Sequence, residues 1–106
     1  MSISIEPDIS LVFADPLRRG ILHLLADEQL CTCHLVELTG AKQPTISHHL
    51  KILKRYGIVE SEAVGRNTYY RIVPSPLIEY ANSLISLANK ASNSQKERLR
   101  CQQENH

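Results

Sequence analysis

Residues 43–57 read QPTISHHLKILKRYG, and this stretch decides the fold. Ile46, Leu50 and Leu53 recur at intervals of four and three residues, which is the apolar stripe of an amphipathic helix. Pro44 is typical of the first turn of a helix, and Gly57 ends the pattern. Polar and basic side chains occupy the remaining positions. The stretch therefore predicts a helix with one buried face and one face open to solvent.

A shorter helix is expected directly before it. Thr32 can cap a helix over residues 33–39, with Leu35 and Leu38 on one side. Gly40 suits the left-handed residue that follows a helix end. Two short helices joined by a tight turn that contains glycine are the helix-turn-helix pattern.

After Gly57 the hydrophobic period changes from that of a helix to that of a strand. Residues 58–62 and 68–73 are rich in β-branched and aromatic side chains, and residues 63–67 join them through Gly65 and Asn67, which tolerate turn conformations. We expect Tyr69 and Tyr70 to pack the resulting hairpin. A hairpin in this position is the wing of a winged helix-turn-helix.

Helices are predicted on both sides of this unit. A short one covers residues 8–14, and a second begins after Asp15 at Pro16 and runs to about residue 26. A last helix over residues 77–91 has an apolar face wider than one small domain needs, which indicates a dimer interface; the alternative is a helix packed on its own core. The predicted fold is mainly α with a β-hairpin, a winged helix-turn-helix that dimerises through its N- and C-terminal helices. It forms one domain over 1–91, followed by a polar, flexible tail over 92–106.

The charge is unevenly distributed along the 106 residues, although the net charge is only +1. Residues 42–71 hold six basic and two acidic side chains, whereas residues 1–41 hold two basic and six acidic ones. A basic middle is typical of a nucleic-acid face, and the alternative is an ordinary solvated surface. No run is apolar enough for a membrane helix, and no secretory signal is visible, so we expect a cytoplasmic protein.

The polar side of the 43–57 helix supplies most of the predicted DNA contacts. On a helical wheel His48 and Lys51 lie opposite the apolar stripe, and Thr45 and Ser47 flank them. His49 falls nearer the stripe, and we expect it to be packed. Arg66 at the hairpin tip can reach the minor groove or the backbone. The predicted DNA-binding residues are Gln43, Thr45, Ser47, His48, Lys51, Arg66 and Asn67.

Two cysteines, Cys31 and Cys33, stand where the first helix of the helix-turn-helix begins. On a regular helix their side chains point about 200° apart, and on a strand their α-carbons are held nearly 7 Å apart, so a shared ion needs an irregular backbone. A helix N-terminus favours the thiolate, the metal-binding form. In a reducing compartment we expect ligands or free thiols and not a disulfide. Ligand binding should distort the helix that supports the DNA-reading helix.

Five segments carry a family resemblance: ADPLR at 14–18, LCTCHL at 30–35, QPTISHHLKIL at 43–53, GIV at 57–59 and GRNTYY at 65–70. Over about residues 13–73 the chain resembles the ArsR-type metalloregulators. The resemblance implies a homodimeric winged-helix repressor of a metal(loid)-resistance operon, with no enzyme activity and no cofactor beyond its inducer. Such a repressor binds double-stranded operator DNA with two-fold symmetry. Trivalent arsenic or antimony releases it.

The chain departs from the family's arsenic-binding motif at one position. Known arsenic sensors read Cys-x-Cys-x-x-Cys, and here Val36 stands in place of the third cysteine. The predicted metal ligands are Cys31, Cys33 and Cys101, the last from the tail of the same protomer or of its partner; the alternative for Cys101 is a free surface thiol. Two thiolates alone would suit a trivalent organoarsenical that already carries one carbon ligand.

Four other functions compete with an arsenic sensor. Cadmium or lead is the second choice of inducer for the same fold. Zinc fits less well, because Cys31, Cys33 and His34 give at most three ligands and the last helix lacks the Asp and His ligands of zinc-sensing relatives. A small thiol reductase lacks a Cys-x-x-Cys motif and a visible catalytic base. A winged-helix module without effector control predicts that substituting both cysteines changes nothing.

Overall fold

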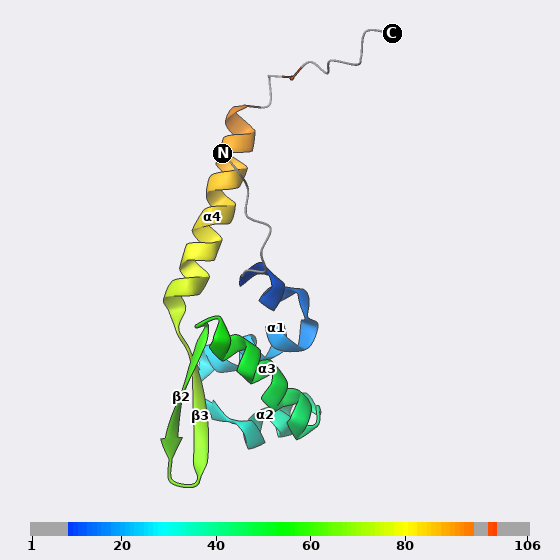
Figure 1. The fold of residues 1–106 in the computed structure, drawn as a ribbon, viewed down its shortest axis with the longest axis vertical. Coiled ribbons are helices and arrows are strands. Elements are labelled where there is room, and N and C mark those ends of the chain that lie inside the picture. Colours follow the sequence, from blue (N-terminus) through cyan, green and yellow to red (C-terminus); the bar gives the residue numbers. More distant parts are fainter. Residues whose placement is uncertain (1–8, 95–97, 100–106) are drawn as a thin grey trace.

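The computed structural model describes residues 9–94 and 98–99 and shows a mainly helical chain with a small antiparallel sheet (Figure 1). The elements follow one another as η1 (Ile9–Ala14), α1 (Pro16–Asp27), β1 (Leu30–Cys31), α2 (Thr32–Thr39), α3 (Gln43–Arg55), β2 (Val59–Val64), β3 (Asn67–Ile72) and α4 (Pro74–Asn93). α2 and α3 form the helix-turn-helix, and the β2–β3 hairpin lies beside them. The predicted winged helix-turn-helix is confirmed.

The helix boundaries follow local chemistry, with small differences from expectation. Asp15 caps α1, since its Oδ1 accepts hydrogen bonds from the backbone N–H of Leu17 at 2.8 Å and of Arg18 at 3.1 Å. The segment before α1 is a 3-10 helix that begins at Ile9. The N-cap of α2 is Cys31 and not Thr32, because Cys31 keeps an extended backbone while Thr32 is already helical. Gly40 ends α2 with φ of 76°, a left-handed conformation that glycine adopts without strain.

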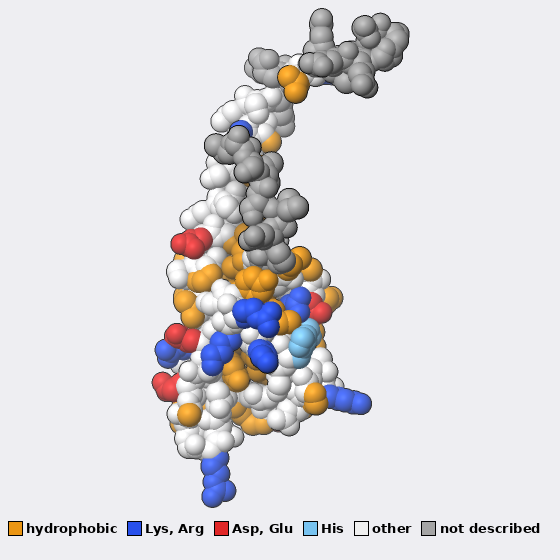
Figure 2. All heavy atoms as spheres, in the orientation of Figure 1, with side chains coloured by type: hydrophobic (Ala, Val, Ile, Leu, Met, Phe, Trp, Pro, Cys, Tyr) orange, Lys and Arg blue, Asp and Glu red, His pale blue; other side chains and the backbone are white. Residues whose placement is uncertain are grey.

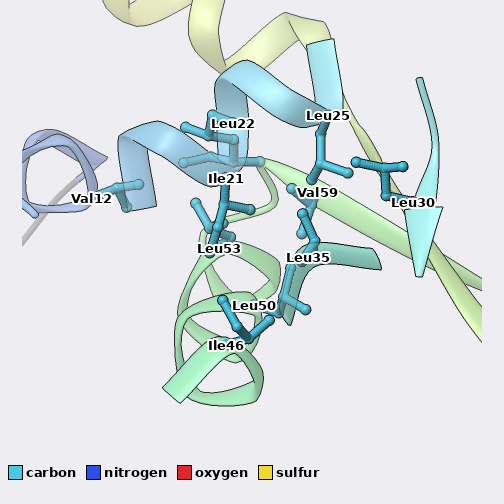
Figure 3. Close-up of a cluster of buried hydrophobic side chains, with 11 residues drawn as sticks. Val12, Ile21, Leu22, Leu25, Leu30, Leu35, Ile46, Leu50, Leu53 and Val59 are labelled. Atoms are coloured by element: carbon cyan, nitrogen blue, oxygen red, sulfur yellow. The ribbon is translucent and has the colours of Figure 1, made fainter. Parts of the chain in front are cut away.

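The core lies between the first three α-helices and the start of the hairpin (Figure 3). Ile21 from α1, Leu35 from α2, and Ile46 and Leu53 from α3 are fully buried. The predicted apolar stripe of α3 therefore faces the core, and the opposite side of that helix is exposed. Because α2 and α3 bury side chains in the same cluster, they hold each other in position.

The sheet contains a strand that sequence periodicity did not predict. β1 is only two residues long and pairs antiparallel with β3, with Leu30 opposite Tyr70 and Cys31 opposite Tyr69. The order in the sheet is β1-β3-β2. The hairpin strands extend further than expected, so that only Gly65 and Arg66 remain between Val64 and its partner Asn67. Tyr69 and Tyr70 are half-buried.

α4 extends away from the rest of the structure (Figure 1). No residue of this helix is buried, and large apolar side chains are exposed along it, Ile78 by 58%, Ile85 by 56% and Leu87 by 66%. Its described contact with the N-terminal segment is a stack of Tyr80 on Phe13, with ring centroids 5.4 Å apart. No helix among residues 9–94 and 98–99 has the length and hydropathy to cross a membrane.

Candidate nucleic-acid interface and thiol site

The outer side of α3 carries the predicted DNA contacts. Figure 2 shows Lys and Arg side chains gathered over this part of the molecule. His48 and Lys51 are exposed on the side of the helix away from the core, and so are the three smaller polar residues at its N-terminal end. The structure therefore leaves every α3 residue predicted to bind DNA accessible to a partner: Gln43, Thr45, Ser47, His48 and Lys51.

The wing presents Arg66 and Asn67 at its exposed tip. Two other basic residues of this region are engaged within the protein. Arg71 Nε pairs with Glu60 Oε1 across the hairpin at 2.6 Å, and Lys54 Nζ donates to Ser61 Oγ at 2.8 Å. Within the described ranges, Lys51 and Arg66 have no carboxylate partner. These two cations are therefore the better candidates for phosphate contacts.

His49 is packed, as its place on the wheel predicted, with 8% of its surface exposed. Its Nδ1 lies 3.2 Å from Arg18 Nη1, and its Nε2 lies 3.9 Å from Asp15 Oδ1. Burial lowers the pKa of His49 below its ordinary value, while the Asp15 carboxylate opposes that shift. His49 thus packs on the inner side of α3.

Arg18 makes structural contacts that its sequence position did not predict. Its Nε donates to the Val12 carbonyl at 3.0 Å and its Nη2 to the Leu11 carbonyl at 3.1 Å, in addition to the contact with His49. One guanidinium therefore joins η1, α1 and α3. The acidic cap and proline before it marked a helix start, but no periodic signal could place a side chain across to a helix more than thirty residues away.

Cys31 and Cys33 meet at the start of α2, where their α-carbons are 5.4 Å apart and their sulfurs form a disulfide bond. The prediction of ligands or free thiols, and not a disulfide, at these two positions is wrong for this structure. The backbone explains the approach, because Cys31 is extended at the N-cap while Cys33 lies in the first helical turn, the irregular geometry that a shared ion requires. Cys31 is buried and Cys33 is exposed, so the pair can be reached from solvent on one side.

His34 completes a cluster with the two cysteines. Its Nδ1 lies 3.3 Å from Cys31 Sγ and also accepts the backbone N–H of Cys31 at 3.3 Å. The ligand atoms of Cys31, Cys33 and His34 all lie within 4.8 Å of one another. Cys101, the predicted third sulfur ligand, falls outside the described residues, as does most of the predicted tail.

Several hydrogen bonds fix the turn between α2 and α3. Thr39 Oγ1 donates to the Leu35 carbonyl at 2.6 Å and accepts from the Ala41 N–H at 3.2 Å. The Gly40 N–H bonds the Val36 carbonyl at 2.9 Å. Leu35, the buried residue of α2, lies in the same cluster as Ile46 and Leu50 (Figure 3). α2 and α3 are therefore joined both by this turn and by their shared core.

Comparison with known proteins identifies the family. Residues 15–61, from the cap of α1 into β2, match the family described as "Bacterial regulatory protein, arsR family". The HTH-type transcriptional regulator MJ1325 of Methanocaldococcus jannaschii is 45% identical over 67 residues, which cover 62% of this chain and 75% of that protein. The chain belongs to the arsR family. The resemblance drawn from the sequence motifs is confirmed.

Other members differ in what their names say they respond to. The arsenical resistance operon repressor of Staphylococcus xylosus is 35% identical to this ArsR-family chain over 78 residues, 74% of each protein. CadC, a cadmium resistance regulatory protein of Listeria innocua, is 39% identical over 62 residues, which cover 58% of this chain and 52% of CadC. The family is thus shared by proteins named for different metals.

Solved structures agree with the fold. A possible transcriptional regulator for arsenical resistance superposes with a TM-score of 0.70 at 30% identity, over 77% of this chain and 85% of that one. The winged helix-turn-helix domain of Mb0332 from Mycobacterium bovis, which is homodimeric, gives a TM-score of 0.61 at 25% identity, over 86% and 83%. This ArsR-family chain is a DNA-binding transcriptional repressor and not an enzyme, which argues against the thiol reductase.

Proposed function

We propose that this ArsR-family repressor senses trivalent arsenic or antimony, or a trivalent organoarsenical, through the thiolates of Cys31 and Cys33. The observation that carries the proposal is the meeting of the two sulfurs at the N-terminus of α2. The sensing form is the reduced one, because a disulfide has no thiolate to offer a metalloid. Cys101 stays the predicted third thiolate, and metalloid resistance is the proposed role of the regulated operon.

Inducer and DNA oppose each other through α2. An ion held by Cys31 and Cys33 constrains the N-cap and first turn of that helix, and α2 supports α3 through their shared core. DNA instead requires α3 in the position that the free protein holds. Two ligands that favour different arrangements of one element weaken each other's binding, and a coupling free energy of about 2 kcal/mol is typical of such systems.

The repressor is proposed to act in the cytoplasm as a homodimer on an operator with an inverted repeat. The exposed apolar face of α4, together with η1, provides the dimer contact. Each protomer then places α3 in a major groove, with Arg66 of the wing at the neighbouring minor groove or backbone. Two reading helices related by a two-fold axis require half-sites about 34 Å apart, or a multiple of that distance.

The test is a titration of the reduced protein–operator complex with arsenite, antimonite and a methylated trivalent arsenical. We expect release of the wild-type protein but not of Cys31→Ser or Cys33→Ser. Thr32→Ser, which lies between the two cysteines, is the matched control and should respond like wild type. Equal release from all four proteins would contradict the proposed sensor. Cys101→Ser tests the third thiolate, since unchanged arsenite affinity in that variant would remove Cys101 from the site.

Cadmium or lead is the second candidate inducer. One structural observation favours it, namely an imidazole nitrogen beside the two sulfurs, because thiophilic divalent cations accept a mixed set of thiolate and imidazole ligands more readily than trivalent arsenic does. The same titration with cadmium and lead salts decides between the two groups of inducer. Release by cadmium at concentrations where arsenite has no effect would favour this second candidate.

A further inference from the structure

The side chain next to the cysteine pair is placed to bind the same ion. His34 lies on α2 one residue after Cys33, and its ring turns back toward the N-cap. Its Nδ1 is 3.3 Å from Cys31 Sγ, and the three ligand atoms fit within 4.8 Å. His34 is half-buried against Tyr69 of β3, with ring centroids 6.1 Å apart, so the imidazole is held in place from the side of the sheet.

Two thiolates and one imidazole form a distinct set of ligands. Thiolates select soft cations, whereas imidazole suits borderline divalent ones, and the combination is typical of zinc and its heavier relatives. Three protein ligands leave a fourth position for water or for a ligand from elsewhere. We propose that His34 Nδ1 is the third ligand of the reduced Cys31–Cys33 site when the site holds a divalent cation such as cadmium or zinc.

Loading this site changes the start of α2. In the described state the Nδ1 lone pair accepts the N–H of Cys31, and that lone pair cannot serve a cation at the same time. Binding of the cation therefore removes a hydrogen bond that helps to hold the first turn of α2. The inference rests on the proposed function only in that both use Cys31 and Cys33; operator release is a separate consequence.

The disulfide must be reduced before a cation can bind. The disulfide takes up two electrons and two protons from an added dithiol, which is itself oxidised to a disulfide, and two thiols result. The divalent cation then displaces the two thiol protons, so binding releases two protons to solvent. The neutral imidazole contributes its lone pair without losing a proton.

The experiment titrates the reduced full chain with cadmium ions under anaerobic conditions and follows the cadmium–thiolate charge-transfer absorption. The variant is His34→Asn, because an asparagine oxygen near the position of Nδ1 can still accept the Cys31 N–H but is a poor ligand for a soft cation. The matched control is His23→Asn, which changes an exposed histidine on α1. We expect His34→Asn to lose cadmium affinity by about tenfold or more and His23→Asn to keep it.

A two-thiolate probe separates ligand loss from damage to the helix. An aryl-substituted trivalent arsenical, which needs only Cys31 and Cys33, should bind wild type and His34→Asn equally. Histidine-labelled protein loaded with an NMR-active cadmium isotope should show scalar coupling from the metal to His34 Nδ1. Cadmium affinity unchanged in His34→Asn, or a coupling to no histidine, would overturn the assignment.

Operator release is measured separately from cadmium binding. If cadmium binds through His34 but the operator complex survives, the ligand assignment stands and the sensor function fails for cadmium. If operator release by arsenite is intact while His34→Asn binds cadmium like wild type, the sensor function stands and the ligand assignment fails. Cys31→Ser that binds cadmium as tightly as wild type would contradict both.

Discussion

Arg18 of α1 contacts His49 of α3, with Arg18 Nη1 3.2 Å from His49 Nδ1. A guanidinium can only donate, so Nδ1 must accept and the ring must carry its proton on Nε2. The Asp15 carboxylate lies on that side, 3.9 Å away. His49 is therefore neutral in the described state, and protonation would place a second cation against Arg18.

The first prediction concerns pH. Burial holds the pKa of His49 below its ordinary value of 6.5, with Asp15 acting in the opposite sense and Arg18 and His48 adding to the lowering. The unfolded chain then binds a proton at a higher pH than the folded chain does, so this contribution is fully present above pH 6.5 and is lost as pH falls through the folded pKa. We expect urea unfolding at fixed protein concentration to show lower stability in mild acid, and His49→Asn to show a smaller loss. An identical acid loss in both proteins would contradict this assignment.

The second prediction concerns Arg18 itself. Arg18→Leu leaves the carbonyls of Leu11 and Val12 and the Nδ1 of His49 without their donor. Because unsatisfied, partly buried acceptors are costly, we expect a loss of about 2 kcal/mol in the free energy of unfolding. The control is Arg19→Leu, whose exposed guanidinium gives up one hydrogen bond, to the Phe13 carbonyl, and which should lose less. Equal losses in the two variants would show that Arg18 has no special role.

The third prediction concerns the DNA face. Lys51→Ala and Arg66→Ala remove exposed cations that have no partner among the described residues, so each should weaken operator binding and lower the salt dependence of affinity by about one released counterion. Lys90→Ala, on the far part of α4, should leave both quantities unchanged. Binding isotherms at several salt concentrations measure the effect. An unchanged salt slope in Arg66→Ala would remove the wing tip from the interface.

The fourth prediction concerns the dimer. Ile85→Asp introduces a charge on the apolar side of α4, where the side chain is 56% exposed in the single chain, and it should shift the protein toward monomer. Ser86→Asp adds the same charge one residue later, on the polar side of the helix, and should stay dimeric. Sedimentation equilibrium distinguishes the two. A monomeric wild type, or a dimeric Ile85→Asp, would argue against α4 as the interface.

The periodicity of apolar residues along the sequence correctly predicted α3 and the wing. The stripe of Ile46, Leu50 and Leu53 correctly placed α3 with one face in the core, and the switch to β-branched residues after Gly57 correctly placed the wing. β1 was not predicted, since a strand of two residues has no period and exists only because β3 lies beside it.

The thiol site was predicted less completely. The spacing of Cys31 and Cys33 indicated an irregular helix start, and that geometry is present. The bond between the two sulfurs was not expected, because the assumption of a reducing compartment argued against it. The placement of His34 depends on the rotation of one side chain back over the N-cap, which a sequence does not specify. The Arg18–His49 contact likewise depends on tertiary packing between distant segments.

The pairing of Cys31 with Tyr69 connects the thiol site to the wing as well as to α3. The residue that caps α2 is also the register partner of Tyr69 in β3, a strand of the wing. A shift of its backbone would therefore reach both elements through which a winged-helix protein contacts the duplex. We expect an ion bound to the two sulfurs to displace α3 and the wing together. The resulting loss of operator affinity should exceed the loss that displacement of either element would cause alone. One small ion could then switch transcription of the regulated gene.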